Sequence, residues 1–142
     1  MKVCDIMSDK VVSIREDEPV SAAARLLRRC NVGALPVCDG QERLRGLVTD
    51  RDIVVRCVAA GADPDATAVR AIMSRGIITA SPFDEVDYAA RLMSRDQVRR
   101  LPVLDGGKLV GVLSLCDIAR DCNCDMEAAA ALSEISANFR RR

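Results

Sequence analysis

The sequence predicts a mixed α/β fold built from two copies of one small unit, and three observations support this fold class. Short segments from the first half of the chain recur in the same order in the second half. Stretches with the apolar spacing of amphipathic helices alternate with short runs of β-branched residues, which favour strands. Of the 142 residues, 49% are hydrophobic, enough for a buried core. Because one copy alone would bury little apolar surface, we expect the two copies to pack together with pseudo-two-fold symmetry.

The repeat can be followed element by element from the start of each copy. Each copy opens with a helical turn that ends in Met-Ser, at residues 3–8 and again at residues 69–74. A predicted strand follows at residues 11–14 and 77–80. A helix then begins at Pro19 and ends near Arg29, and the second copy repeats its pattern. One apolar face of the two helices consists of Val20, Ala23, Ala24 and Leu27 in the first copy, and Val86, Ala89, Ala90 and Met93 in the second.

Two further strands and a last helix complete each copy. Leu-Pro-Val segments at residues 35–37 and 101–103 lie in the first of these strands. The second strand ends at Thr49 in one copy and at Ser114 in the other. The turn between the strands is one residue shorter in the second copy, a change that loops tolerate. Each copy is therefore predicted to contain, in this order, a helical turn, a strand, a helix, two strands and a second helix.

These boundaries divide the chain into four predicted parts. The first repeat covers residues 3–58, a linker rich in Gly, Pro and Asp covers 59–68, and the second repeat covers 69–121. Residues 122–142 contain a helical pattern rich in alanine and a basic tail. We expect this C-terminal helix, over Asp125–Ala137, to pack on a neighbouring element or on a second subunit.

Composition and charge exclude several classes of function. The 21 basic residues balance the 21 acidic ones, which argues against binding to nucleic acid or to an anionic membrane surface. No apolar run approaches the roughly 18 residues of a membrane span, and the N-terminus lacks a signal peptide. We therefore expect a cytoplasmic protein whose seven cysteines are mostly reduced. Because histidine is absent, a Ser-His-Asp triad and a His-ligated metal are excluded, and we expect no enzyme.

The repeated motifs resemble those of the CBS domain, the module first named from cystathionine β-synthase, and the whole chain resembles a stand-alone CBS pair. The motifs are the Ile-Met-Ser openings, the Leu-Pro-Val segments, and paired Gly-h-h-[Ser/Thr]-x-x-Asp-Ile endings in which h is apolar. Residues 51–54 and 59–64 also resemble the small bacterial hypoxic-response type of CBS-pair protein. The resemblance implies two β-α-β-β-α units, frequent homodimers, and regulatory binding of an adenosine compound, namely AMP, ADP, ATP, NAD or S-adenosylmethionine.

Two strand-to-helix junctions are the predicted ligand sites, and we expect them to flank one central cleft between the two repeats. In the first junction (Thr49–Asp52), a hydroxyl caps a helix that carries a carboxylate in its first turn, and the second junction (Ser114–Asp117) repeats this pattern. A helix N-terminus attracts anions, and a neighbouring carboxylate can accept hydrogen bonds from ribose. The resemblance assigns the ribose to the aspartates and a phosphate to the Ser/Thr region. The alternative reading is a capping box with a purely structural role.

The two predicted sites differ in their cations. Arg51 lies within the first junction, whereas the second has Cys116 at the same position. By resemblance, Arg99 would reach phosphate at the first junction and Arg100 would lie nearer the second. The first copy offers Gly33 in place of these arginines. Polyphosphate ligands should therefore bind the first junction more tightly than the second. The alternative is that the arginines are solvated side chains with no role in ligand binding.

The remaining predictions concern the adenine pockets and the cysteines. The resemblance implies that Val12, Val32, Ile78 and Val98 line the adenine pockets, although ordinary core packing explains apolar residues equally well. Cys122-Asn123-Cys124 lacks the second pair that a structural zinc site needs, so no metal is predicted. The alternative function is a redox- or metal-responsive structural dimer whose nucleotide sites are degenerate.

Overall fold

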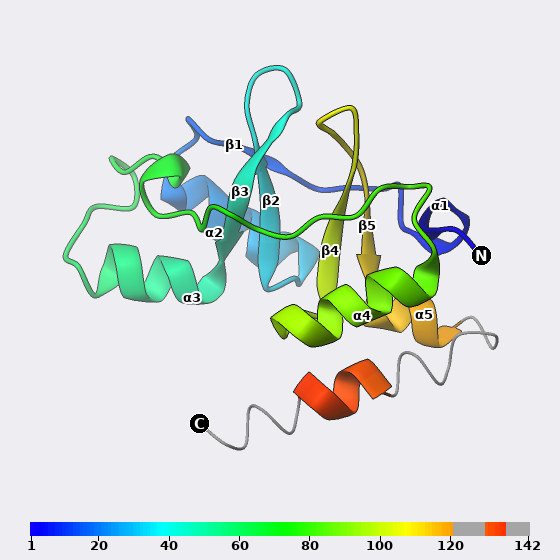
Figure 1. Cartoon of the computed structure of the whole chain (residues 1–142). Coiled ribbons are helices and arrows are strands. Elements are labelled where there is room, and N and C mark those ends of the chain that lie inside the picture. The colour runs from blue at the N-terminus through cyan, green and yellow to red at the C-terminus, as the bar shows by residue number, and fades with distance from the viewer. Residues whose placement is uncertain (121–129, 136–142) are drawn as a thin grey trace. The chain divides into compact units, whose positions relative to one another are not determined.

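The computed structural model describes residues 1–120 and 130–135, and its contacts divide the chain into two compact units (Figure 1). The contiguous unit consists of residues 12–77. The composite unit combines residues 1–11 with the chain from residue 78 onward. Among the described helices, none is both long and apolar enough to cross a membrane.

The contiguous unit contains a three-stranded sheet with helices before and after its hairpin. Strand β1 runs parallel to β2, and β2 runs antiparallel to β3. Its elements are β1 (Ile14–Arg15), α2 (Val20–Cys30), β2 (Ala34–Cys38), β3 (Leu44–Thr49), α3 (Asp50–Ile53), the π-helix η1 (Val54–Val58) and the 3₁₀ helix η2 (Val69–Ala71). The first predicted strand is displaced toward its C-terminal end, because only Ile14 and Arg15 have partners on β2.

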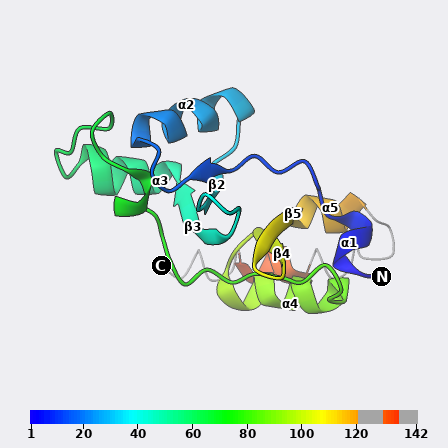
Figure 2. The same cartoon turned by 90° about the horizontal axis from the view of Figure 1, so that it is seen from above.

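The composite unit repeats this order of elements with a two-stranded sheet. Its elements are α1 (Val3–Ile6), α4 (Val86–Asp96), β4 (Arg100–Asp105), β5 (Lys108–Ser114), α5 (Leu115–Arg120) and a helical segment over residues 130–135. Strands β4 and β5 pair antiparallel, and α4 lies alongside them in both views (Figure 2). The strand predicted at 77–80 is reduced to one parallel bridge between Ala80 and Val103.

The two long helices confirm the predicted apolar faces with one exception. All four predicted residues of α4 are buried, whereas Ala24 of α2 is exposed. Ala90, the counterpart of Ala24, lines a cavity together with Ala130 and Ala131 of the C-terminal helical segment, and Ala131 belongs to the same buried cluster. This segment therefore packs on α4 of its own chain, and the contiguous unit has no corresponding cover among its residues 12–77.

The Met-Ser opening of each sequence repeat packs on a strand of the other repeat. Ser74 forms an antiparallel bridge with Leu47 of β3, and Ser8 forms the equivalent bridge with Val112 of β5. A methyl group added at Gly46 would come within 2.5 Å of the Ser74 carbonyl oxygen. The glycine that begins each Gly-h-h-[Ser/Thr] motif thus leaves room for the opening segment of the other repeat.

Candidate functional site

The first junction forms where β3 passes directly into α3. Thr49 has an extended backbone, and its Oγ1 accepts a hydrogen bond from the Asp52 backbone N–H at 3.0 Å. In return, Asp52 Oδ2 accepts the Thr49 backbone N–H at 3.0 Å. This reciprocal pair is a capping box, which satisfies two backbone donors at the helix start. The predicted cap is therefore confirmed, and it fixes the position of the Asp52 carboxylate.

Asp52 makes further contacts beyond its capping bonds. Only 8% of the residue is exposed, so its charge needs partners. Arg56, one helical turn later, brings Nη1 to 3.7 Å from Asp52 Oδ1. The Ser74 hydroxyl lies 3.5 Å from both carboxylate oxygens. The carboxylate is thus held between the start of its own helix and the Met-Ser segment that packs on β3.

The second junction repeats the cap at the end of β5. Ser114 Oγ accepts the Asp117 backbone N–H at 3.1 Å, and Asp117 Oδ2 accepts the Ser114 N–H at 2.8 Å. Asp117 is buried to a similar extent as Asp52. Arg120 forms an ion pair with Asp117 Oδ1, one helical turn later. Both copies therefore present a carboxylate that accepts one backbone N–H within a capping box and is paired with one arginine.

The arrangement leaves each carboxylate able to accept further hydrogen bonds. A carboxylate offers about four lone-pair positions, and the cap uses one of them on Oδ2. The side chains of the partner arginines are half or more exposed, whereas those of the two aspartates are about nine-tenths buried. The capping reading and the ribose-binding reading are therefore compatible, because one carboxylate has enough acceptor positions for both.

The structure brings several predicted residues to the junction of their own unit. Arg51 is exposed in the first turn of α3, and the Gly33 carbonyl accepts the Asp50 N–H at 3.0 Å. In the composite unit, the Arg99 carbonyl accepts the Leu115 N–H at 3.0 Å. Arg100 lies directly opposite Ser114 on the β4–β5 ladder, and both Arg99 and Arg100 are exposed. The role of Arg99 at the first junction stays a prediction.

The four predicted adenine-lining residues have different environments. Val32 packs against the core of the contiguous unit, and Ile78 and Val98 pack against the core of the composite unit. All three are only partly buried. Val12 is 43% exposed, just before β1. Core packing thus accounts for part of the environment of three of these residues, and it does not account for Val12.

Sequence reasoning missed three polar residues at the junctions: Arg56, Ser74 and Arg120. The spacing Asp52 to Arg56, and Asp117 to Arg120, places each arginine one turn beyond its aspartate, and this local signal was available. The contact between Ser74 and Asp52 joins residues far apart in the sequence. Nothing in the local pattern indicated it, because the two sequence repeats exchange their opening segments.

The described cysteines are dispersed rather than gathered into a cluster. Cys4 and Cys116 are exposed, whereas Cys38 and Cys57 are buried. Burial raises the pKa of the Cys38 thiol, which keeps it protonated near neutral pH. Within residues 1–120 and 130–135, no group of three or more cysteine, aspartate or glutamate side chains could hold a metal ion. The sequence prediction for Cys122 and Cys124 lies outside the described residues.

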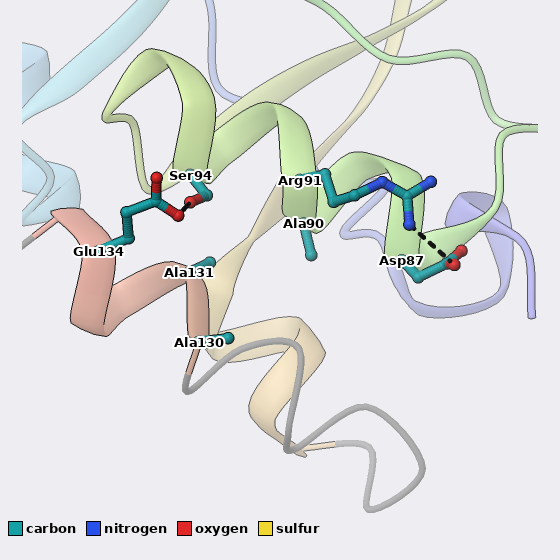
Figure 3. Close-up of a pocket in the computed structure, with 7 residues that line it drawn as sticks. All are labelled: Asp87, Ala90, Arg91, Ser94, Ala130, Ala131 and Glu134. Atoms are coloured by element: carbon teal, nitrogen blue, oxygen red, sulfur yellow. Dashed lines mark hydrogen bonds and ion pairs between the residues drawn. The ribbon is translucent and has the colours of Figure 1, made fainter.

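A cavity of about 260 Å³ lies between α4 and the C-terminal helical segment (Figure 3). Ser94 donates a hydrogen bond to Glu134 across it. Asp87 and Arg91 form an ion pair on α4 at 3.3 Å. The alanines of both helices leave this space open, and the cavity belongs to the packing of the C-terminal segment rather than to either junction.

Comparison with known proteins identifies the family. The CBS domain model matches residues 3–58 and 69–122, so this chain belongs to the CBS domain family and carries two CBS repeats. The CBS domain-containing protein YhcV of Bacillus subtilis is 37% identical over 134 residues, which are 94% of each chain. Hypoxic response protein 1 of Mycobacterium tuberculosis is 38% identical over 116 residues, or 82% of this chain and 81% of that protein.

Solved structures of CBS proteins are similar to this chain, and several contain ligands. Hypoxic Response Protein I with two coordinated zinc ions has a TM-score of 0.79 and 36% identity, covering 85% of this chain and 98% of that one. The CBS domain pair of protein MJ0100, in complex with methylthioadenosine and S-adenosylmethionine, has a TM-score of 0.72 and 30% identity, with 84% and 94% covered. CBSX2 in complex with AMP has a TM-score of 0.73 and 27% identity, with 84% and 93% covered. These matches confirm the predicted α/β fold of tandem CBS repeats.

Proposed function

We propose that this protein is a cytoplasmic regulatory module that binds an adenosine-containing ligand at its two junctions. The ligand is AMP, ADP, ATP, NAD or S-adenosylmethionine, and its ribose hydroxyls donate to the carboxylates of Asp52 and Asp117. The observation that carries this proposal is the fixed carboxylate that recurs at both junctions with unused acceptor positions. The adenosine ligands of the related MJ0100 and CBSX2 structures support the same ligand class.

Phosphate selectivity follows from the unequal cations of the two junctions. Arg51 is exposed at the first junction, whereas Cys116 occupies its position at the second. A phosphate gains charge-assisted hydrogen bonds from an arginine that it cannot gain from a thiol. Ligands with more phosphate groups therefore bind the first junction more tightly, with Arg99 as a further proposed cation.

A thermal-shift screen tests the ligand class. Purified protein is heated with each of the five adenosine compounds in turn, and with guanosine phosphates as matched controls. A ligand at 100 times its dissociation constant adds about 2.7 kcal/mol to the free energy of unfolding. An increase of melting temperature with at least one adenosine compound, larger than with its guanosine analogue, supports the proposal. No increase with any of the five would overturn it.

The proposed role is regulatory binding rather than catalysis. Ligand binding would act by shifting the populations of two arrangements of the repeats or subunits. Incubation of the protein with ATP or NAD should leave both compounds chemically unchanged, as followed by chromatography. Turnover that co-purifies with the protein and is lost in an Asp52→Asn variant would contradict this role.

We also propose that the protein is a homodimer. Val54, Val55 and Val58 of η1 are each about half or more exposed, which is unusual for neighbouring large apolar side chains. A second copy of the chain could cover such a face. Analytical ultracentrifugation at micromolar concentration should give the mass of a dimer, and a Val55→Asp, Val58→Asp double variant should shift it toward the monomer. A monomeric wild-type protein would contradict this proposal.

A second candidate function is a metal- or redox-responsive dimer with degenerate nucleotide sites. The zinc ions of the related Hypoxic Response Protein I favour it. Since this chain has no histidine, its zinc ligands would be cysteine, aspartate or glutamate. Elemental analysis of protein purified without chelator discriminates the two candidates. Two results together would favour this second function. The protein would contain stoichiometric zinc, and its melting temperature would fall in EDTA but would not change with adenosine compounds.

A further inference from the structure

Arg56 is the centre of a polar network at the first junction. Its Nη1 lies 3.0 Å from the Ile72 carbonyl oxygen and 3.3 Å from that of Met73. The same nitrogen lies 3.4 Å from the Ser74 hydroxyl and 3.7 Å from Asp52 Oδ1. A guanidinium group has five N–H donors in a rigid plane, so it can hold a carboxylate and main-chain carbonyls together.

The segment that Arg56 contacts is the part of the chain that leads toward the composite unit. Ile72 and Met73 are buried in the core of the contiguous unit. Ser74 exchanges two backbone hydrogen bonds with Leu47 of β3, at 2.8 and 3.0 Å. The chain enters the composite unit at residue 78. Arg56 thus joins the first-junction carboxylate to the docked end of the connecting segment.

The second junction differs in this respect. Arg120 pairs with Asp117, but among the described residues it makes no hydrogen bond to the Ile6–Ser8 segment that packs on β5. Arg120 lies three residues after Asp117, whereas Arg56 lies four residues after Asp52. The residue aligned with Arg56 is Asp121, an acidic residue. The network around Arg56 therefore distinguishes the two junctions.

We propose that Arg56 couples ligand binding at Asp52 to the docking of residues 72–74. This coupling rests on the proposed function of Asp52 as a ribose acceptor. A ribose bound to Asp52 restrains the carboxylate, the carboxylate restrains Arg56, and Arg56 holds the Ile72 and Met73 carbonyls in place. By linkage, a docked segment must favour the ligand to the same degree. Arg56 is thus a positioning residue through which first-junction occupancy reaches the connecting segment.

Hydrogen exchange of the full-length protein without ligand tests the docking contact. The Leu47 and Ser74 amides report the bridge between β3 and the segment. In an Arg56→Gln variant these amides should exchange at least about tenfold faster than in wild type, as expected for the loss of hydrogen bonds to a charged donor. The matched control is Arg120→Gln, which should leave these two amides unchanged. Equal rates in wild type and Arg56→Gln would overturn the inference.

The same variants with AMP test the coupling itself. AMP should slow exchange of the Leu47 and Ser74 amides in wild type, and this effect should be lost in Arg56→Gln while Arg120→Gln retains it. Equal slowing in wild type and Arg56→Gln would overturn the coupling. An Arg56→Lys variant keeps the positive charge but lacks the planar guanidinium group, so AMP should not slow exchange of the two amides in it either. If Arg56→Gln does not fold, Arg56→Lys takes its place in this test. If AMP did not raise the melting temperature of the wild-type protein, the proposed function would be contradicted for AMP. Hydrogen exchange of ligand-free wild type and Arg56→Gln would still show whether Arg56 holds residues 72–74 in place.

Discussion

The aspartates of the two junctions show how one carboxylate can have both a structural and a proposed binding role. Asp52 Oδ2 is engaged with the Thr49 backbone, while Oδ1 faces an arginine that is half exposed. Asp117 has the same two kinds of partner. Because the cap needs only an oxygen acceptor and the ribose contact is strengthened by negative charge, substitutions can separate the two roles.

The first prediction separates capping from binding at Asp52. Asp52→Asn keeps an acceptor oxygen for the Thr49 N–H and removes the charge, whereas Asp52→Ala removes both. Both variants should bind AMP more weakly, but only Ala should lose the hydrogen bond from the Thr49 N–H to the side chain of residue 52, which costs about 1 kcal/mol of unfolding free energy. Titration calorimetry measures the affinity and urea denaturation measures the stability. Unchanged affinity with a loss of stability in Ala would show that Asp52 is a structural cap alone.

The second prediction compares the two junctions. Asp52→Asn and Asp117→Asn are matched changes, since each aspartate lies in an equivalent capping box. Asp52→Asn should reduce ATP affinity more than Asp117→Asn does, because Arg51 lies only at the first junction. The difference should shrink as salt is raised, since exposed charges are screened. Equal losses from the two substitutions would mean that the arginine asymmetry does not determine ligand choice.

The third prediction concerns the buried Cys38 thiol. Burial raises its pKa in the folded protein above the ordinary value of 9.0, so folding disfavours the thiolate. The stability contributed by the neutral thiol is therefore present below pH 9 and is lost as the pH rises through the folded pKa. Iodoacetamide should modify the exposed Cys4 and Cys116 well before Cys38, as read by peptide mass spectrometry. Modification of Cys38 as fast as Cys4 at neutral pH would contradict its burial.

Secondary-structure elements were predictable where their signal is local. The capping boxes at Thr49 and Ser114 were predicted because a Ser/Thr and an acid three residues later are a complete local motif. The faces of α2 and α4 were predicted from helical spacing, and only Ala24 was wrong, because no residue of the contiguous unit covers it as the 130–135 segment covers α4. The short first strands were poorly predicted, because pairing rather than composition determines where they begin. Arg56 was missed although its spacing from Asp52 is local, and the Ser74 contact could not be predicted from any local pattern.

The fourth prediction concerns the close approach of the Met-Ser segments to β3 and β5. An added Cβ at Gly46 would lie 2.5 Å from the Ser74 carbonyl oxygen, and one at Gly111 would lie 2.9 Å from that of Ser8. Gly46→Ala and Gly111→Ala should each cost about 1–3 kcal/mol, since the backbone must shift. The control is Gly40→Ala, where the nearest atom is the flexible end of Arg15 at 3.5 Å. An equal loss in urea denaturation at Gly40 would show that the close contact is not the cause.

At the scale of the whole molecule, the sequence repeats and the compact units divide the chain differently. The family model matches the repeats at residues 3–58 and 69–122, whereas the compact unit begins at residue 12 and ends at residue 77. Sequence similarity identifies which segments are copies of each other. It does not reveal which copy an opening segment packs against, because four of the six residues of the two openings are identical. That information is present only in the long-range contacts.

The last prediction follows from this exchange of opening segments. The fragment 12–77 contains the whole contiguous unit, including Val69, Ile72 and Met73 of its core. The equally long fragment 3–68 carries the first sequence repeat and the linker but lacks these three buried side chains, each worth about 1.5–3 kcal/mol of burial. It would also leave Gly46 without the segment that packs on it. We expect 12–77 to unfold cooperatively in circular dichroism and 3–68 to show no cooperative transition. Cooperative unfolding of 3–68 at a melting temperature equal to that of 12–77 would mean that the exchanged opening contributes nothing to the stability of this unit.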